Sequence, residues 1–196
     1  LEALEALGRE RILVLDGAMG TQLQTYKLSE EDFRGERFAN WSCSLKGNND
    51  MLNLTRPDTI REVHFDYIAA GAGIIETNTF SATRIAQADY DMEDFAAEIA
   101  EQGARLAREA ADQAEAKFES PVAVAGAIGP TNKTLAISSD VENSGYRDVS
   151  FEDVRKVYVE QAVAMGPHVD FILIETIFDT LNAKAAIKAV LDAKAS

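Results

Sequence analysis

Polar side chains lie at the ends of four apolar, strand-like runs in this chain, at residues 11–17, 74–80, 122–131 and 171–179. When parallel strands alternate with helices, the carboxyl ends of the strands meet on one face of the sheet or barrel. We therefore expect one site on that face. Neighbouring carboxylates there could hold an ammonium group by charge-assisted hydrogen bonds. The candidate residues are Asp16, Glu76, Thr77, Asn78 and Glu175.

The elements that must position these residues are predicted helices between the strands. Pro57 suits a first helical turn, and Ser150 followed by two acids is typical of a helix N-cap. Apolar residues recur at helical spacing through residues 92–118, and the stripe over residues 96–111 is expected to pack in the core. Helices are thus predicted at residues 1–8, 57–70, 92–118, 150–166 and 180–193, with a long polar connection at residues 29–56.

Repeated β–α units require a parallel sheet with right-handed crossovers. Eight such units make a (β/α)8 TIM barrel, and four are predicted here, so the fold class is α/β with about the first half of such a barrel. Residues 1–196 are expected to form one partial barrel domain. The chain begins without Met and stops inside a predicted helix at residues 194–196, so we expect it to be a piece of a longer protein.

The composition limits the function classes. Thirty-three acidic and 19 basic residues give a formal charge of −14, which repels nucleic acid and anionic membrane surfaces. No apolar run is long enough to span a membrane, and no signal peptide is visible, so a soluble, cytoplasmic protein is expected. The single cysteine, Cys43, excludes an internal disulfide and a multi-cysteine metal site made by this chain alone.

Several motifs together resemble one family. They are RILVLDGAMGT from Arg11, DFRGERF from Asp32, KGNND from Lys46, IETNTF from Ile75, GPTNKT from Gly129 and IETIFDTLNAKAA from Ile174. Their order and intervals resemble the homocysteine-binding barrel at the start of cobalamin-dependent methionine synthases. The resemblance runs over residues 11–193 and is weakest at residues 92–120 and 137–149.

The resemblance implies transfer of a methyl group, originally from 5-methyltetrahydrofolate, from methylcobalamin to the zinc-activated thiol of homocysteine. It assigns Asp16 and Glu175 to the substrate ammonium and places Thr77 near the substrate, where its hydroxyl could add a contact. The turn from Gly17 to Thr21 offers backbone N–H groups for the substrate carboxylate. Gly17 allows close backbone approach there.

Zinc and cobalamin belong to the complete enzyme that this resemblance implies. The family's three zinc-ligating cysteines come from later strands that this chain lacks, and Cys43 matches none of them. We assign no catalytic residue and no metal ligand within this chain, which alone is expected to be inactive. Its expected partners are homocysteine and the cobalamin and folate modules of the same protein.

Other features have structural interpretations. Glu76 is expected to be a solvated strand-end carboxylate, and residues 46–50 a loop that packs its own polar groups. Residues 129–132 form either a simple turn or a wall of the pocket. His64 and His168 have no acid or ligand partner at useful spacing, so neither is expected to serve catalysis or metal binding.

Two alternatives to the cobalamin enzyme remain. A betaine- or S-methylmethionine-dependent homocysteine methyltransferase shares the acids of the first and fourth strands. The RGERF and KGNND motifs favour the cobalamin enzyme. The other alternative is a non-catalytic half-barrel that only binds or assembles.

Overall fold

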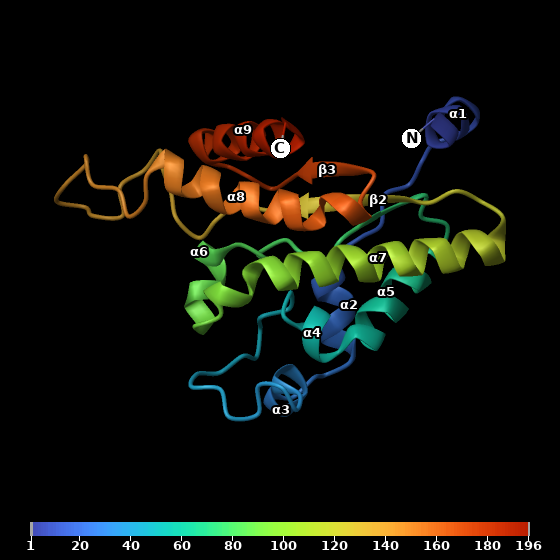
Figure 1. Cartoon of the computed structure of the whole chain (residues 1–196), viewed down its shortest axis with the longest axis horizontal. Coiled ribbons are helices and arrows are strands. Elements are labelled where there is room, and N and C mark those ends of the chain that lie inside the picture. The colour runs from blue at the N-terminus through green and yellow to red at the C-terminus, as the bar shows by residue number, and fades with distance from the viewer. Residues whose placement is uncertain (1, 196) are drawn as a thin grey trace.

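Three short parallel strands and a set of helices make up the computed structural model, which describes residues 2–195 (Figure 1). The strands are β1 (Ile74–Glu76), β2 (Ala123–Ile128) and β3 (Phe171–Ile174). The α-helices are α1 (Glu2–Glu10), α2 (Met19–Thr25), α3 (Glu30–Arg34), α4 (Leu52–Thr55), α5 (Pro57–Ala69), α6 (Arg84–Gln87), α7 (Ala96–Phe118), α8 (Phe151–Met165) and α9 (Thr180–Ala195). Three 3₁₀ turns complete the order: η1 (Ala88–Tyr90), η2 (Glu93–Phe95) and η3 (Gly166–His168).

The sheet has the order β1-β2-β3, and both pairings are parallel, as the β–α alternation predicts. Ile75 is paired with Val124, and Ala127 with Leu173. Strands that follow one another in the chain are therefore neighbours in the sheet, and their carboxyl ends share one edge.

The prediction of a full strand at residues 11–17 is wrong. Only Leu15 forms an isolated parallel bridge, to Ile74, and the Asp16 N–H donates to the Ile74 carbonyl at 2.9 Å. The side chains of Ile12 and Val14 are 89% and 55% exposed. Since apolar burial stabilises a strand, this run lacks the packing that would extend its pairing. The bridge still places Asp16 beside the end of β1.

The other three predicted strands are confirmed in position but end earlier than expected. β1 ends at Glu76, β2 at Ile128 and β3 at Ile174. Beyond them the backbone turns into loops, as where the Thr79 N–H donates to the Thr77 carbonyl at 2.9 Å. The polar residues at the ends of the apolar runs therefore belong to loops at one edge of the sheet.

The predicted helices are confirmed, with local differences at their ends. Pro57 opens α5, and Ser150 caps α8 in a box with Asp153, through backbone-to-side-chain bonds of 3.0 and 3.1 Å. The helix predicted from residue 92 begins as η2 and continues as α7. The helix predicted over residues 1–8 is α1, but Leu1 lies outside the described residues, as does Ser196. None of the described helices has the length and apolar character needed to cross a membrane.

The connection at residues 29–56 contains α3 and α4, which its polar composition did not predict. The Glu30 carboxylate accepts the N–H groups of Leu45 and Lys46 at 2.9 and 2.8 Å. The Arg34 guanidinium, paired with Glu30 at 2.7 Å, donates to the Trp41 and Cys43 carbonyls. A helix of five residues thus fixes the segment that leads to residues 46–50.

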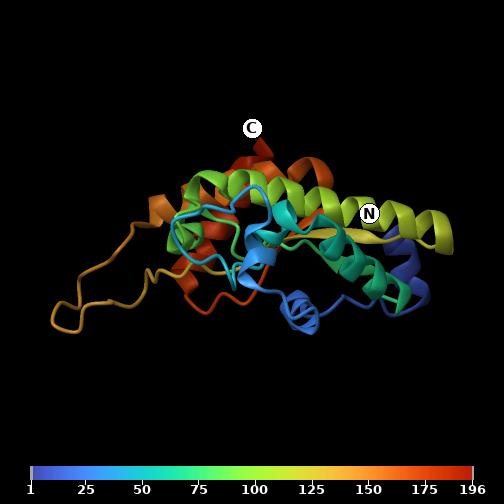
Figure 2. The same cartoon turned by 90° about the horizontal axis from the view of Figure 1, so that it is seen from below.

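The core lies between the sheet and α7, α8 and α9. Small buried residues of α7, among them Ala104, Ala107 and Ala111, let this helix approach β2 closely. The predicted core stripe of residues 96–111 is thereby confirmed. In contrast, residues 136–148, in the connection between β2 and α8, are mostly exposed and extend away from the other elements (Figure 2).

Candidate active site

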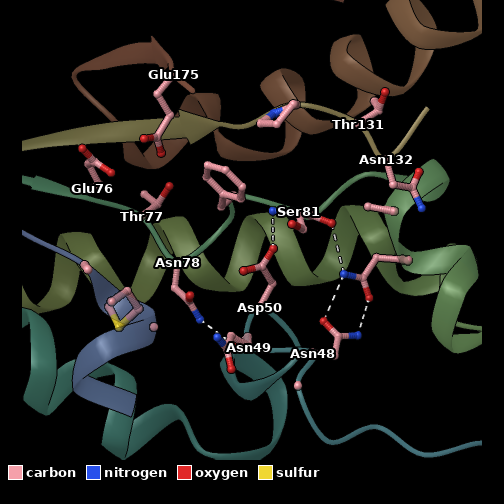
Figure 3. A pocket seen from close by; sticks show the side chains of 18 of the residues that line it. Asn48, Asn49, Asp50, Glu76, Thr77, Asn78, Ser81, Thr131, Asn132 and Glu175 are labelled. Atoms are coloured by element: carbon pink, nitrogen blue, oxygen red, sulfur yellow. Dashed lines mark hydrogen bonds between the residues drawn. The ribbon is translucent and has the colours of Figure 1, made fainter. Parts of the chain in front are cut away.

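One pocket at the carboxyl edge of the sheet contains all four residues assigned to the substrate. It has a volume of about 740 Å³ and is lined by residues from the ends of β1 and β3, the start of α2, the loop at residues 47–50 and the turn at η1 (Figure 3). Asp16, Gly17, Thr77 and Glu175 all line it. The structure thus brings together residues as far apart in the chain as Asp16 and Glu175.

Asp16 is fixed by the neighbouring strand. Its Oδ1 accepts the backbone N–H of Glu76 at 3.1 Å. The pKa of Asp16 is raised to about 7, mainly by burial, with the nearby carboxyls of Glu76 and Glu175 adding to the rise and the Glu76 N–H hydrogen bond opposing it. A ligand with a positive charge would therefore stabilise the ionised form of this carboxyl.

Glu76 belongs to the site, and the expectation of a solvated carboxylate is wrong. Its side chain is only partly exposed and points toward that of Glu175 (Figure 3). Burial, followed by repulsion from Glu175, raises the pKa of Glu76 to about 7. Glu175 follows β3, where its N–H donates to the Ile128 carbonyl at 3.0 Å. The site therefore has three strand-end carboxyls, where the sequence assigned two.

Thr77 is buried in the wall of this pocket. Its hydroxyl accepts the Ala127 N–H at 2.9 Å and lies 2.6 Å from the Thr79 hydroxyl. Because Thr79 in turn donates to the Ala127 carbonyl, the Thr77 proton is directed toward Thr79. This arrangement ties the end of β1 to β2.

Gly17 and the start of α2 form another wall. A Cβ at Gly17 would lie 3.3 Å from the Tyr67 hydroxyl, which is closer than most side-chain contacts. Ala18 has φ −54° and caps α2 without a side-chain hydrogen bond. The turn therefore accommodates Ala18 without a left-handed backbone, and it presents main-chain groups to the pocket.

The loop at residues 46–50 also lines the pocket, a role that the sequence analysis did not assign. The side chains of Asn48 and Gln87 bond reciprocally at 2.7 and 3.2 Å, and both are buried. Asp50 accepts the Ser81 N–H at 2.5 Å, and Gln87 donates to the Ser81 carbonyl at 3.1 Å. The expectation that this loop packs its own polar groups holds for its main chain, where the Asn49 N–H donates to the Gly47 carbonyl at 3.0 Å. The side chains of Asn48 and Asp50 instead bond to residues 81–87, and the Asn49 carbonyl accepts from Asn78.

Part of this result was available in the sequence. Glu76 occupies the same place after an apolar run as Asp16 and Glu175, and position alone put it among the strand-end candidates; what the sequence did not show is that its carboxyl is partly buried beside Glu175. For Asp50 the only signal was a polar run directly before Met51 and Leu52, both buried. Its burial depends on contacts with residues about thirty positions away, which no local pattern contains.

The described residues offer no ligand set for zinc. Among residues 2–195 no group of three or more His, Cys, Asp or Glu side chains is arranged to hold a metal ion. The Cys43 thiol lies 3.1 Å from the Tyr90 carbonyl, and the buried His64 lies on α5. His168 lies in η3, before β3. None of the three is a pocket-lining residue.

Comparisons with known proteins agree with this architecture. The chain is similar to the homocysteine methyltransferase MmuM from Escherichia coli, at 24% sequence identity and with 98% of the chain covered. The TM-score is 0.72 for the metallated form, 0.73 for the oxidized form and 0.65 for the apo form. The chain covers 63%, 62% and 60% of those three structures, so it spans about three fifths of their length.

At that identity the structural likeness concerns the fold. The sequence gives a further match, because residues 13–195 fit the family model described as homocysteine S-methyltransferase. This match includes Asp16, Glu76 and Glu175, which meet in the pocket. The chain belongs to the homocysteine S-methyltransferase family.

Proposed function

We propose that the pocket binds homocysteine, with its ammonium group held by Asp16, Glu76 and Glu175. The observation that carries this proposal is the meeting of three strand-end carboxyls in one pocket, two of them with the pKa raised to about 7. A bound ammonium would relieve the repulsion among these groups and make charge-assisted hydrogen bonds with them. The backbone N–H groups at Gly17 to Gly20 are proposed to hold the substrate carboxylate.

The proposed reaction is methyl transfer to the homocysteine thiol as part of a complete barrel. A thiol reacts as its thiolate, and a zinc ion would supply that activation by coordinating the sulfur. The described residues do not fit a zinc site, so its ligands are proposed to come from outside this chain. The role of this chain is to bind and orient the amino acid.

The methyl donor proposed from the motifs is methylcobalamin, as in cobalamin-dependent methionine synthases, with folate and cobalamin modules as partners. A small donor such as S-methylmethionine or betaine is the second candidate. The lining of the pocket favours the small donor, since it contains five carboxyl side chains and, among the described residues, no Lys, Arg or His. The third candidate, a half-barrel that only binds or assembles, would bind homocysteine and transfer no methyl group. Methionine formation by the whole protein, measured with each donor in turn, distinguishes all three.

The ammonium site is tested by titrating homocysteine into the whole protein and its Asp16→Asn and Glu175→Gln variants. Each change removes a charge from a partly desolvated site and should weaken binding by about 2–5 kcal/mol. Asn at position 16 keeps an oxygen for the Glu76 N–H, so the local fold is retained. Glu101→Gln, an exposed acid on α7, is the matched control and should change binding by about 0–1 kcal/mol. Parent-like affinity in both site variants would refute the proposed ammonium site.

A further inference from the structure

Thr176 has an unusual backbone conformation directly after Glu175, one of the proposed ammonium-binding residues. Its φ is 56°, in the left-handed region that β-branched residues rarely adopt. Thr176 follows the end of β3, whereas the other non-glycine residues of positive φ within residues 2–195 follow helical turns, where this conformation is common. Those residues are Lys27, Asp91 and Glu119. A strained residue beside a binding group points to a role in that site.

The chain is anchored on both sides of Thr176. Before it, the Glu175 N–H donates to the Ile128 carbonyl at 3.0 Å and extends the pairing of β3 with β2. After it, Ile177 packs against the hydrophobic core. The buried Asp179 carboxylate then accepts four backbone N–H groups at 2.6–3.3 Å, from Leu135, Ala136, Leu181 and Asn182. A strained turn persists only where its surroundings impose it, and these anchors do so here.

The turn at Thr176 controls the direction of the Glu175 side chain. Because the chain from Ile177 onward is fixed, a relaxed Thr176 with negative φ would require rotation about the Glu175 backbone, which would redirect its carboxyl. In the observed conformation Glu175 points toward Glu76 in the pocket, and the Thr176 hydroxyl donates to Glu175 Oε2 at 3.3 Å (Figure 3). Neighbouring carboxylates repel each other, so an unconstrained Glu175 would turn toward solvent. The backbone keeps it at the site.

We propose that Thr176 is a positioning residue, whose left-handed backbone aims the Glu175 carboxylate into the pocket before the substrate arrives. This inference rests on the proposed homocysteine site. A ligand that finds Glu175 already in place does not have to turn it against the repulsion of Glu76, so less binding free energy is lost to reorganisation. Thr176 acts through Glu175 and makes no proposed contact with the substrate.

Two substitutions at position 176 change the backbone preference in opposite directions. Asn tolerates the left-handed region, so Thr176→Asn should raise the melting temperature of the whole protein by about 2–4 °C and keep homocysteine affinity within about threefold. Pro fixes φ near about −65°, so Thr176→Pro should turn Glu175 away and weaken homocysteine binding by about tenfold or more. Thermal unfolding and calorimetric titration measure the two effects.

Thr180, an exposed residue at the first position of α9, provides the matched controls. Because it is helical, Asn relieves no strain there, and Pro is well accepted at a first helical position. Thr180→Asn should change the melting temperature by less than about 1 °C, and Thr180→Pro should keep homocysteine affinity within about threefold. A melting temperature of Thr176→Asn that is no higher than that of the parent would show that the turn stores no strain and would overturn the inference.

A double-mutant cycle with Glu175→Gln tests whether Thr176 acts through Glu175. In the Glu175→Gln background, Thr176→Pro should weaken binding by less than about threefold further, because the misdirected group has already lost its charge. A full additional tenfold loss would show general disruption and overturn the inference. If Thr176→Pro does not fold, Thr176→Val takes its place in the cycle. Val disfavours the left-handed region and lacks the hydroxyl, so a loss of about threefold is expected in the parent and none in Glu175→Gln.

Homocysteine binding by the parent separates this inference from the proposed function. If the parent does not bind homocysteine, the proposed function fails. If Glu175→Gln weakens binding but the Thr176→Pro variant, or Thr176→Val in its place, binds like the parent, only the positioning role of Thr176 fails.

Discussion

His64 shows how far a single residue can depart from the usual rule for buried polar groups. Its side chain is fully buried on α5, and within the described part of the chain neither ring nitrogen has a hydrogen-bond partner. Burial lowers the pKa of His64 to about 4, so the imidazole is neutral at physiological pH. An unpaired polar group in the core costs free energy, which an apolar side chain would not.

We therefore expect His64→Leu to raise the free energy of unfolding by about 1 kcal/mol, because it removes two unpaired nitrogens from the core. Chemical denaturation of the two proteins measures the difference. His168→Leu is the control: this partly exposed residue uses its backbone carbonyl, not its ring, to accept from Arg108, and the change should stay within about 0.5 kcal/mol. A loss of more than about 1 kcal/mol in His64→Leu would show that the imidazole is bonded after all.

At the scale of elements, α7 approaches the pocket wall through Gly103. A Cβ at this position would lie 2.5 Å from Asn53 Nδ2, 2.7 Å from Thr79 Cγ2 and 3.0 Å from the Asn78 carbonyl. Asn53 and Asn78 bond to each other, and Asn78 also donates to the Asn49 carbonyl at 2.9 Å. Close packing of a helix thus supports a polar network that ends in the pocket.

Gly103→Ala should destabilise the protein by about 1–3 kcal/mol, because the added methyl group must displace Asn53 and Thr79 from a filled core. Thermal unfolding measures the loss. Gly166→Ala makes the same substitution at the end of α8, where a Cβ meets no atom within 4 Å and φ is −47°. That control should be neutral or slightly stabilising, and equal effects in the two variants would contradict the packing argument.

Among the helices and strands, local sequence predicted where helices begin but not which polar groups are buried. Pro57 and the Ser150 cap placed helix starts correctly because these signals act within one turn. The run at residues 11–17 has strand composition, but its side chains remain exposed, so pairing stops at one bridge. Glu76 was read as solvated because no local pattern shows its burial or its approach to Glu175, which the chain brings near only after two more β–α units. Propensity and capping are local, whereas burial of polar groups is set by tertiary contacts.

For the whole molecule, the buried acids of the pocket control the pH dependence of stability. The pKa values of Asp16, Asp50 and Glu76 are raised to about 7, for each residue mainly by burial. Between about pH 4 and 7 the folded protein therefore binds more protons at these groups than the unfolded chain does. Their contribution to stability is present at low pH and is lost as the pH rises through 7. His64, with its lowered pKa, acts in the opposite direction between about pH 6.5 and 4.

We expect the ligand-free parent to lose stability relative to Asp50→Asn as the pH is raised from 5 to 8, because only the parent must ionise this buried carboxyl. The difference in melting temperature between the two proteins, measured across that range, isolates the contribution of Asp50. A difference that stays constant with pH would show that the Asp50 pKa is not raised. Homocysteine should flatten the pH profile of both proteins, since its ammonium stabilises ionised Asp16 and Glu76.

Trp41, the single tryptophan of the chain, lies in the segment that leads to the pocket-lining residues 47–50. Its ring packs edge-on against Phe38 and Phe95, with centroids 5.4 and 5.6 Å away, and its Nε1–H donates to the carbonyl of Tyr90 at 2.9 Å. Tyr90 itself lines the pocket. The chain thus has a single indole, hydrogen-bonded to the main chain of a pocket residue, and we expect its emission to change when the pocket is occupied, without any added label.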